Sequence, residues 1–457
     1  MRIDRATGGR HRLPDRHWLN EERVRVYSWL TVVIFAITMV WWTARSMPDL
    51  VDPRGKPVGY DFIAFWSAAR LAIEGRAEAA YDWIAIEAAH RIAVPGLQGK
   101  LFLWHYPPTY LLMVLPLGLL SYLAALGVFL AASLALWAGL VRRILVDRRA
   151  WIVAAALPAG LVNFMHGQNG FLTAALAGFA LLALQRRPVL AGILIGLLAI
   201  KPHLAMLFPV ALVATGQWRA FAAAAATALG FTAISVAAFG WPTVIAFLAD
   251  VTTVRQLVDN GNLPWGMMPS PYVFALSLGL PGGAAMALQI AVAIAAAICV
   301  WIAWRAPASP FEAPFEAPFE APFEAKAAVL ATASLLMSPY VFYYDLTWAG
   351  LAMAWLAVLG LRHGFRRGER EILLAAWACP LIMYVILWLT GVQIGFPILV
   401  ALLALAMLRA RQPAATRGGW RAGPAPTSGS APDSHERPAP GGIAPPNKRG
   451  LVTGRQT

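Results

Sequence analysis

A succession of long apolar segments, separated by short connections that carry arginine, is the feature that most constrains the fold of this chain. The first segment, residues 27–47, is longer than the apolar core of a cleavable signal and lacks a small-residue cleavage site. Eleven more segments follow between residues 108 and 408. A bilayer core needs about 20 helical residues, and shorter or broken spans survive where protein or water satisfies their backbone. The sequence therefore predicts an all-α polytopic membrane bundle of about ten to twelve transmembrane helices.

Composition supports this fold class. Hydrophobic residues make up 59% of the chain and charged residues 13%, whereas a soluble domain is about one quarter charged. The net charge is +14, but only five of the 37 basic residues are lysines. The arginines gather near the termini and in short loops, which indicates cytoplasmic anchoring and not nucleic-acid binding. Cys299 and Cys379 lie in apolar runs and predict neither a disulfide framework nor a metal cluster.

The distribution of arginine also predicts the orientation. Cytoplasmic loops are rich in Lys and Arg, so both termini and the arginine-bearing connections are expected inside, and the remaining connections outside. A four-residue repeat, PFEA, indicates a solvated connector, and the Pro- and Gly-rich tail indicates disorder. The expected divisions are a cytoplasmic segment 1–26, a membrane domain 27–409 with external loops 48–107 and 240–283 and a repeat linker 307–326, and a disordered cytoplasmic tail 410–457.

Asp61 heads the stretch "GYDFIAFWSAARL", shortly after the first predicted span. Asp is a favoured N-cap, and the apolar residues behind it follow helical spacing up to Gly75. The stretch therefore predicts an amphipathic helix on the outer membrane surface. A general base held where water meets lipid is the alternative role for Asp61, and spacing alone does not exclude either role.

Two further motifs place polar groups between apolar segments. "NFMHGQNGFL" contains His166, Gln168 and Asn169; a tight turn explains Asn169 but needs neither of the other two. A polar cluster of this kind suits a sugar, whose hydroxyl groups need paired donors and acceptors. Lys201 interrupts a long apolar stretch beside Pro202. It either snorkels to the interface or binds a phosphate, since an ionisable residue in a membrane segment is costly and indicates function.

Aromatic and acidic residues mark two other external positions. His105 and Tyr106 lie in "WHYPPTYLL", where an interfacial aromatic belt and a polar site are both consistent with the sequence. Tyr344 and Asp345 end another span, and an acidic residue there is unusual. The chain has no phosphate loop, Rossmann fingerprint, zinc spacing or nucleophile elbow. We therefore expect no metal, no cofactor and no nucleotide held by a soluble domain.

The order and spacing of these motifs resemble glycosyltransferase family 87, over most of residues 27–350. Its integral-membrane enzymes belong to the GT-C superfamily and include mycobacterial polyprenol-phosphate-mannose-dependent mannosyltransferases. The segments that carry the resemblance are "DFIAFWSAARLAIEGRAEAAYD", "HYPPTYLLMVLPLGLL", "HGQNGFLTAALAGFALL", "RRPVLAGILIGLLAIKPHLAMLFPVALVATGQWRA" and "SPYVFYYDL". Where the mycobacterial members have an aromatic residue, Asp and paired His after Ser-Pro, this chain has Tyr343-Tyr344-Asp345, which leaves the sugar open.

The resemblance implies a multi-pass enzyme of the bacterial inner membrane, surrounded by membrane lipids and with its site facing the periplasm. A polyprenyl-phosphate-linked sugar would be the donor, and a lipid or glycan the acceptor. Asp61 holds the place of the family's catalytic acidic residue, Lys201 stands in its Lys-Pro motif and Gln168 in its Gly-Gln motif. Lys201, His166 and His105 are then the expected donor contacts, and the expected sugar or acceptor contacts are Gln168, Asn169, Tyr106, Tyr344 and Asp345.

Two other classes of function remain as alternatives. A secondary transporter shows paired repeats with broken helices at matching positions, and only one broken pair is visible here. A non-catalytic membrane subunit could bind a lipid-linked glycan for another enzyme. The collection of polar residues at one predicted face favours the transferase over the transporter.

Overall fold

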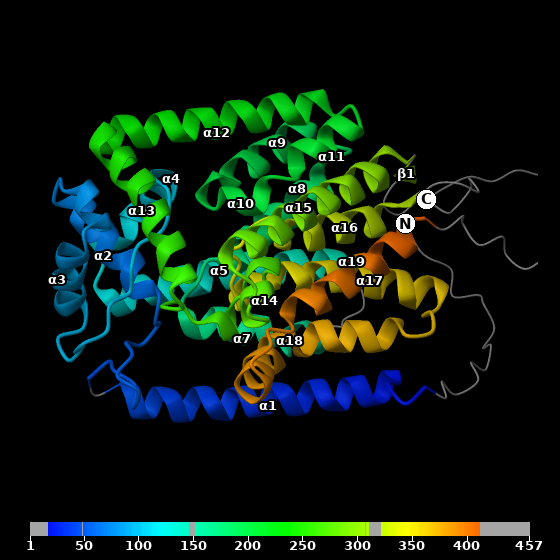
Figure 1. Cartoon of the computed structure of the whole chain (residues 1–457), viewed down its shortest axis with the longest axis horizontal. Coiled ribbons are helices and arrows are strands. Elements are labelled where there is room, and N and C mark those ends of the chain that lie inside the picture. Colours follow the sequence, from blue (N-terminus) through cyan, green and yellow to red (C-terminus); the bar gives the residue numbers. More distant parts are fainter. Residues whose placement is uncertain (1–16, 48, 146–150, 307, 310–320, 412–457) are drawn as a thin grey trace, which may run out of the picture. The chain divides into compact units, whose positions relative to one another are not determined.

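A computed structural model describes residues 17–47, 49–145, 151–306, 308–309 and 321–411 (Figure 1). Most of the predicted repeat linker, the first sixteen residues and the predicted tail from residue 412 lie outside the described residues. The described part is a bundle of helices. The α-helices are α1 (Glu21–Ser46), α2 (Phe62–Ile73), α3 (Trp83–Ala93), α4 (Pro108–Val114), α5 (Tyr122–Ile144), α6 (Trp151–Ala155), α7 (Pro158–His166), α8 (Gly170–Ala183), α9 (Pro188–Leu197), α10 (Pro202–Ala205), α11 (Phe208–Ala214), α12 (Trp218–Phe239), α13 (Trp241–Asp259), α14 (Pro271–Ser277), α15 (Gly282–Arg305), α16 (Phe323–Leu335), α17 (Thr347–His363), α18 (Glu369–Thr390) and α19 (Gly395–Ala410).

Short 3-10 helices and one small strand pair complete the described structure. The 3-10 helices are η1 (Ala77–Tyr81), η2 (Leu115–Leu119), η4 (Leu198–Ile200), η5 (Trp265–Met267) and η6 (Tyr343–Leu346). The strands β1 (Ala308–Ser309) and β2 (Ala321–Pro322) pair in parallel. β1 follows α15 in the chain, and β2 precedes α16.

Six helices of the described residues are long and apolar enough to cross a membrane. A 22-residue helix is about 33 Å long, which matches the hydrocarbon thickness of a bilayer. Several shorter apolar helices pack among them. Neighbouring protein covers the backbone groups at the ends of these short helices. The six segments are Glu21–Ser46, Tyr122–Ile144, Trp218–Phe239, Gly282–Arg305, Tyr343–His363 and Glu369–Thr390. The prediction of an all-α polytopic membrane protein is therefore confirmed.

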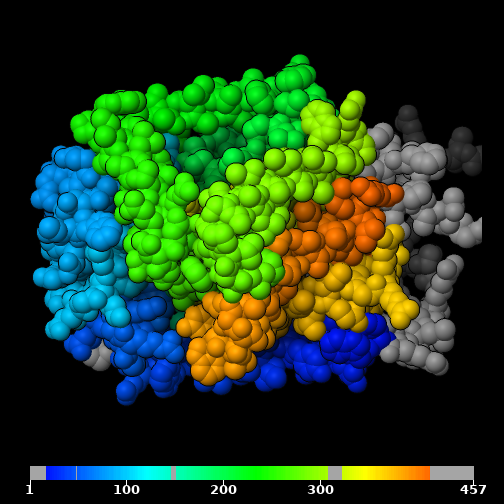
Figure 2. All heavy atoms as spheres, in the orientation of Figure 1, coloured from blue at the N-terminus to red at the C-terminus, as the bar shows by residue number. Residues whose placement is uncertain are grey.

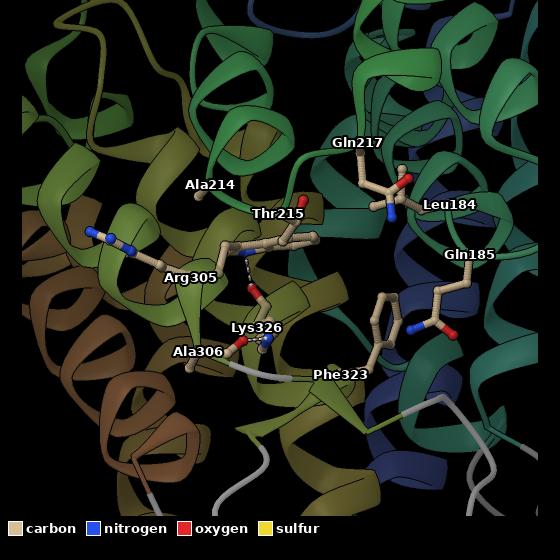
Figure 3. A pocket seen from close by; sticks show the side chains of 10 residues that line it. Leu184, Gln185, Ala214, Thr215, Gln217, Arg305, Ala306, Phe323 and Lys326 are labelled. Carbon is tan, nitrogen blue, oxygen red and sulfur yellow. Dashed lines mark hydrogen bonds between the residues drawn. The ribbon is translucent and has the colours of Figure 1, made fainter.

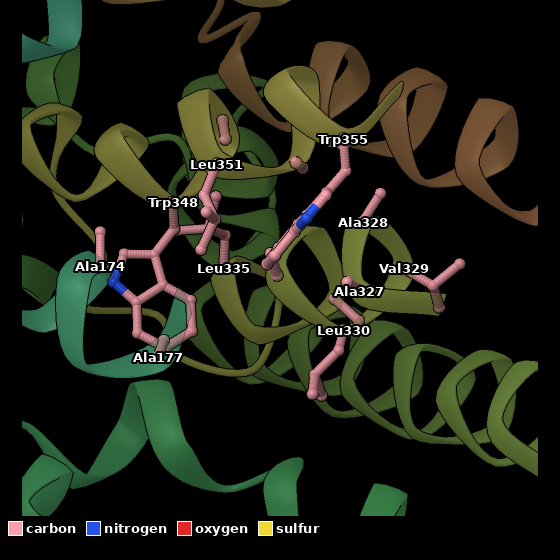
Figure 4. Packing of buried hydrophobic residues seen from close by; sticks show 14 of the residues in the cluster. Ala174, Ala177, Ala327, Ala328, Val329, Leu330, Leu335, Trp348, Leu351 and Trp355 are labelled. Carbon is pink, nitrogen blue, oxygen red and sulfur yellow. The ribbon is translucent and has the colours of Figure 1, made fainter. Parts of the chain in front are cut away.

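The main core surrounds α16, all thirteen residues of which are buried. Its small side chains let α17 and α19 approach closely, and Trp348 and Trp355 of α17 fill the remaining space (Figure 4). The first turn of α16, Phe323–Lys326, was expected to belong to the repeat linker. It is helical instead, because Phe323 packs edge-on against Trp355 at 6.3 Å. The linker is thus shorter at this end than the sequence suggested.

A second core is formed mostly by residues 49–145, together with Trp42 and Ile200, and α2 is at its centre. Nine of the twelve residues of α2 are buried, so it is not the amphipathic surface helix that we expected. The aromatic side chains on its different faces are covered by protein: Phe65 meets Trp104, and Trp66 meets Tyr122. The helix of this loop with one buried and one exposed face is α3. It exposes Ile84 and buries Ile86 and Ala89.

Some predicted segments are divided in the structure, and one predicted loop is largely helical. The segment 108–141 forms α4 and η2 before the long α5; Pro108 is the first residue of α4, and Pro116 is the second residue of η2. The segment 151–165 is broken into α6 and α7 before Pro158. The predicted external loop 240–283 is largely helical and contains α13 and α14. Figure 2 shows the green surface from α12 through α15 covering much of one face.

The turn between α7 and α8 brings its polar residues against the start of α2, and Gly167 makes this approach possible. Its φ is +56°, and a Cβ there would lie 2.5 Å from the Cβ of Phe62. We expect Gly167→Ala to lower the free energy of unfolding by about 1–3 kcal/mol through strain, with the clash adding to this. Gly75→Ala is a matched control, because Gly75 shares a positive φ but has open space around it. Denaturation in mixed micelles measures both; equal losses would contradict the clash.

Candidate active site

Asp61 occupies the N-cap position of α2, but its side chain makes no capping hydrogen bond. Oδ2 instead accepts hydrogen bonds from Nε2 of Gln168 at 3.0 Å and from Nδ1 of His166, 3.1 Å away. The backbone turns sharply just before it, since Tyr60 has a φ of +37°. The Asp61 side chain is 27% exposed, while His166 is buried. The carboxylate is thus fixed by two neighbours and open on one side.

His166 joins Asp61 to a third side chain. Its Nε2 lies 2.7 Å from the hydroxyl of Tyr343, which comes from η6. The ring of Tyr60 packs edge-on against the imidazole, with ring centroids 4.9 Å apart. An imidazole held on both nitrogens has a fixed orientation. Asp61, His166 and Tyr343 therefore form a continuous hydrogen-bonded chain.

The electrostatic surroundings keep Asp61 ionised. Burial alone would raise the pKa of its carboxyl, but the charge of His166 and the hydrogen bonds from His166 and Gln168 outweigh burial and lower the pKa below the ordinary 3.8. Lys56 adds a smaller effect of the same sign. At neutral pH Asp61 is therefore a carboxylate that can accept a proton.

Lys201 lies at the predicted break between η4 and α10 and is buried. Its Nζ donates to Oδ1 of Asp345 at 2.5 Å and to Oδ1 of Asn169 at 3.4 Å. The ammonium also lies over the ring of Tyr344, 5.0 Å from its centroid. Lys201 does not snorkel to the interface; its charge is compensated by a fully buried carboxylate.

Gln168 links these two groups of residues. Its Oε1 accepts a hydrogen bond from the hydroxyl of Tyr106 at 2.9 Å, and Nζ of Lys201 is 5.9 Å from the ring centroid of Tyr106. Asn169, next in the chain, has a buried Nδ2 without a partner among the described residues. A buried donor without a partner is costly, so this amide is available to a ligand oxygen.

The structure thus gathers eight of the nine expected residues into one cluster, which we name the Asp61–Lys201 cluster. Its members are Asp61, Tyr106, His166, Gln168, Asn169, Lys201, Tyr344 and Asp345, with Tyr343 in addition. Tyr343 was not among the expected residues, because neighbouring tyrosines at a span end are ordinary interfacial residues. The hydrogen bond to His166 is made by Tyr343, whereas Tyr344 has only a ring contact with that imidazole, with centroids 6.0 Å apart.

His105 is the exception. Its Nδ1 lies 2.8 Å from Oδ2 of Asp250, a buried residue of α13. Nearby, the ring of Tyr81 packs against Phe247 of the same helix. These contacts hold α13 against residues 77–105. Asp250 carried no diagnostic spacing in the sequence, so this pair was not predictable.

Within the described ranges, no group of three or more His, Cys, Asp and Glu side chains is arranged to hold a metal ion. The ionisable residues of the site are instead paired with one another or with amides. The site can accept a proton at Asp61 and offers amide, phenol and ammonium donors beside it.

Comparison with known proteins identifies the family. The model of glycosyltransferase family 87 matches residues 104–339, which is more than half of the chain. The match includes His166, Gln168 and Lys201, whereas Asp61 lies before it and Asp345 after it. No curated protein and no solved structure matches the chain. The chain belongs to glycosyltransferase family 87 and is a multi-pass membrane glycosyltransferase.

Proposed function

We propose that the protein transfers a hexose from a polyprenyl-phosphate donor to a lipid or glycan acceptor on the non-cytoplasmic face, by a GT-C-type inverting mechanism. One observation carries this proposal: Asp61 is an ionised, partly exposed carboxylate held by His166 and Gln168 in the loop that follows the first span. Such a group has the charge, access and rigidity of a general base.

In the proposed reaction Asp61 takes the proton of an acceptor hydroxyl. The hydrogen bonds from His166 and Gln168 both end on Oδ2, which leaves Oδ1 to receive that proton. The acceptor oxygen forms a bond to the anomeric carbon while the bond from that carbon to the phosphate oxygen breaks. The electron pair of the broken bond leaves with the polyprenyl phosphate, and the configuration inverts.

The other cluster residues are proposed to orient the substrates and to balance charge. Gln168, Asn169, Tyr106, Tyr344 and Asp345 offer amide, phenol and carboxylate groups to the sugar or acceptor. Lys201 and His166 are the proposed contacts for the donor phosphate, although both ring nitrogens of His166 are engaged, with Asp61 and Tyr343. Because the ammonium of Lys201 is 2.5 Å from Asp345, it would contact a phosphate only by sharing or leaving that carboxylate. His105 is engaged with Asp250, and we assign it no donor contact.

Two features of α5 support the proposed sidedness. Its first residue, Tyr122, packs against Phe62 beside Asp61, and its last turn carries Arg142 and Arg143. The helix has 23 residues, so these ends are about 35 Å apart. Arginine-bearing ends are cytoplasmic by the positive-inside rule. Asp61 would then face the opposite side.

We expect the acid limb of the profile of kcat/KM against pH to move to higher pH when His166→Gln removes the imidazole. Burial raises the pKa of Asp61 and His166 counteracts it, so the pKa rises in the variant. Asp61 is then protonated at a higher pH, and kcat/KM falls at a higher pH during acidification. Tyr343→Phe retains the imidazole and should move the limb less. The same acid limb in the wild type and His166→Gln would contradict the assigned pKa effect.

The test of the function is transfer by purified protein. The full chain is reconstituted and offered a panel of radiolabelled polyprenyl-phosphate sugars together with membrane-lipid and glycan acceptors. We expect transfer from at least one donor, without any nucleotide sugar. Transfer from nucleotide sugars alone would overturn the donor class, and specific donor binding without any transfer would favour the binding-subunit alternative.

A further inference from the structure

A cavity of about 320 Å³ lies at the arginine-bearing ends of the helices, away from the Asp61–Lys201 cluster. Three connections of the chain contribute to it: those that follow α8, α11 and α15, the last together with the start of α16. Figure 3 shows Gln185 and Gln217 on one side of this cavity and Arg305 on the other. The lining residues are Leu184, Gln185, Ala214, Thr215, Gln217, Trp304, Arg305, Ala306, Phe323 and Lys326.

The charge around this cavity is positive. Arg305 and Lys326 line it, and within the described part of the chain no acidic residue does. Arg186, Arg187 and Arg219 lie within two residues of the lining glutamines, and they are exposed. Their guanidinium groups have no hydrogen-bond or ion-pair partner among the described residues. Positive charge of this density favours an anion.

The backbone reinforces this preference. The start of α12, after Gln217, and the start of α16, at Phe323, have no side-chain cap, although the first N–H of α12, that of Trp218, donates to the carbonyl of Gly216 at 2.9 Å. At the end of α11, a carbonyl is satisfied within the chain, because the N–H of Gln217 donates to the carbonyl of Leu212 at 2.9 Å. Lys326 binds the carbonyl of Ala306. Helix N-termini without a side-chain cap favour a phosphate.

The surroundings of the cavity indicate a lipid and not a soluble anion. Trp218, beside Gln217, is 60% exposed, and Trp301, one turn before Arg305, is 38% exposed. Tryptophan at this position is typical of the level of lipid head groups. The helices that carry them, α12 and α15, have little of their spans buried in protein, at 11% and 22%. Acyl chains would lie along these faces, with the phosphate at the cavity.

We propose that this cavity binds the phosphodiester head group of an anionic phospholipid of the leaflet at the arginine-bearing end. The arginines neutralise the phosphate, and Thr215, Gln185 and Gln217 offer groups to the hydroxyls of a polar head. Basic pockets between membrane helices bind such head groups in the cytoplasmic leaflet. This binding is separate from sugar transfer and does not depend on the proposed donor.

Native mass spectrometry of the full chain, released from detergent and titrated with phosphatidylglycerol, tests the proposal. We expect one site that binds phosphatidylglycerol more tightly than phosphatidylcholine. Arg219→Gln/Arg305→Gln should weaken the first binding event roughly five-fold for each arginine removed. The matched control is Arg25→Gln/Arg143→Gln, which removes two exposed arginines from elsewhere at the predicted cytoplasmic end and should leave this affinity unchanged.

Thermal unfolding of both double variants identifies a loss of binding that is due only to misfolding. Should a cavity variant unfold early, the single variant Arg305→Gln is measured in its place. Equal affinities in the wild type and the folded cavity variant would overturn the site. Glycerol phosphate is titrated in parallel as a soluble anion without acyl chains. If it binds as tightly as phosphatidylglycerol, the assignment to a lipid is overturned and the cavity is a site for a free anion.

Discussion

Asp61→Asn is expected to lower kcat for sugar transfer by about 10²–10⁴-fold. The amide has nearly the shape of the carboxylate, so the packing of α2 is retained, but it cannot accept a proton from an acceptor hydroxyl. Purified wild type and variant are compared by initial rates at saturating donor. KM for the donor should change little, because the carboxylate acts on the acceptor.

The control for this experiment lies in the same loop. Asp82 caps α3 by accepting from the N–H of Ala85 at 2.8 Å, and it has no contact with the cluster. Asp82→Asn should transfer sugar at the wild-type rate. If Asp61→Asn is folded and also transfers at the wild-type rate, Asp61 is not the base. A loss of equal size in both variants would indicate damage to the loop as a whole.

The second large effect is expected for the buried ion pair. Lys201→Met leaves the fully buried Asp345 without its cation, and breaking such a pair costs about 3–5 kcal/mol of folding free energy. The double variant Lys201→Met/Asp345→Leu removes both charges and should recover much of that loss. Titration with sodium dodecyl sulfate in mixed micelles measures the free energy of unfolding of each variant.

An exposed pair supplies the comparison. Arg91 and Glu87 form an i,i+4 pair on α3 with side chains 64% and 38% exposed. Arg91→Met should cost less than about 1 kcal/mol, since water screens such pairs. Similar losses for Lys201→Met and Arg91→Met would show that Asp345 is not isolated from water. A double variant as unstable as Lys201→Met alone would show that packing, and not charge, dominates at this position.

The general class of fold could be predicted because hydropathy and the placement of arginine depend on the sequence alone. The gathering of His166, Gln168 and Lys201 was anticipated for the same reason, since alternating connections fall on one side of a membrane. The contact of Lys201 with Asp345 was not, because the two are 144 positions apart and spacing carries no information at that range. Tyr343 and Tyr344 are neighbours of the same residue type, and only the backbone of η6 decides which hydroxyl forms the hydrogen bond with Nε2 of His166.

The burial of α2 was missed for a different reason. A helix with aromatic residues on several faces has the same pattern whether lipid or protein covers it. The start of α2 was anticipated, and Asp61 does occupy its N-cap position, but the side chain makes no capping hydrogen bond. Its side chain forms hydrogen bonds 105 and 107 positions away instead. Local propensity favours a cap, and the tertiary contacts outweigh it.

The complete burial of α16 has a consequence for how the chain is made. This helix has thirteen residues, carries Glu324 and Lys326, and has no face toward lipid. Such a segment does not partition into a bilayer by itself, because it is too short and carries two charges. It must wait at the translocation machinery until α15 and α17 enclose it. Biogenesis of this enzyme therefore depends on α17, which is synthesised after α16, as well as on α15, which is synthesised before it.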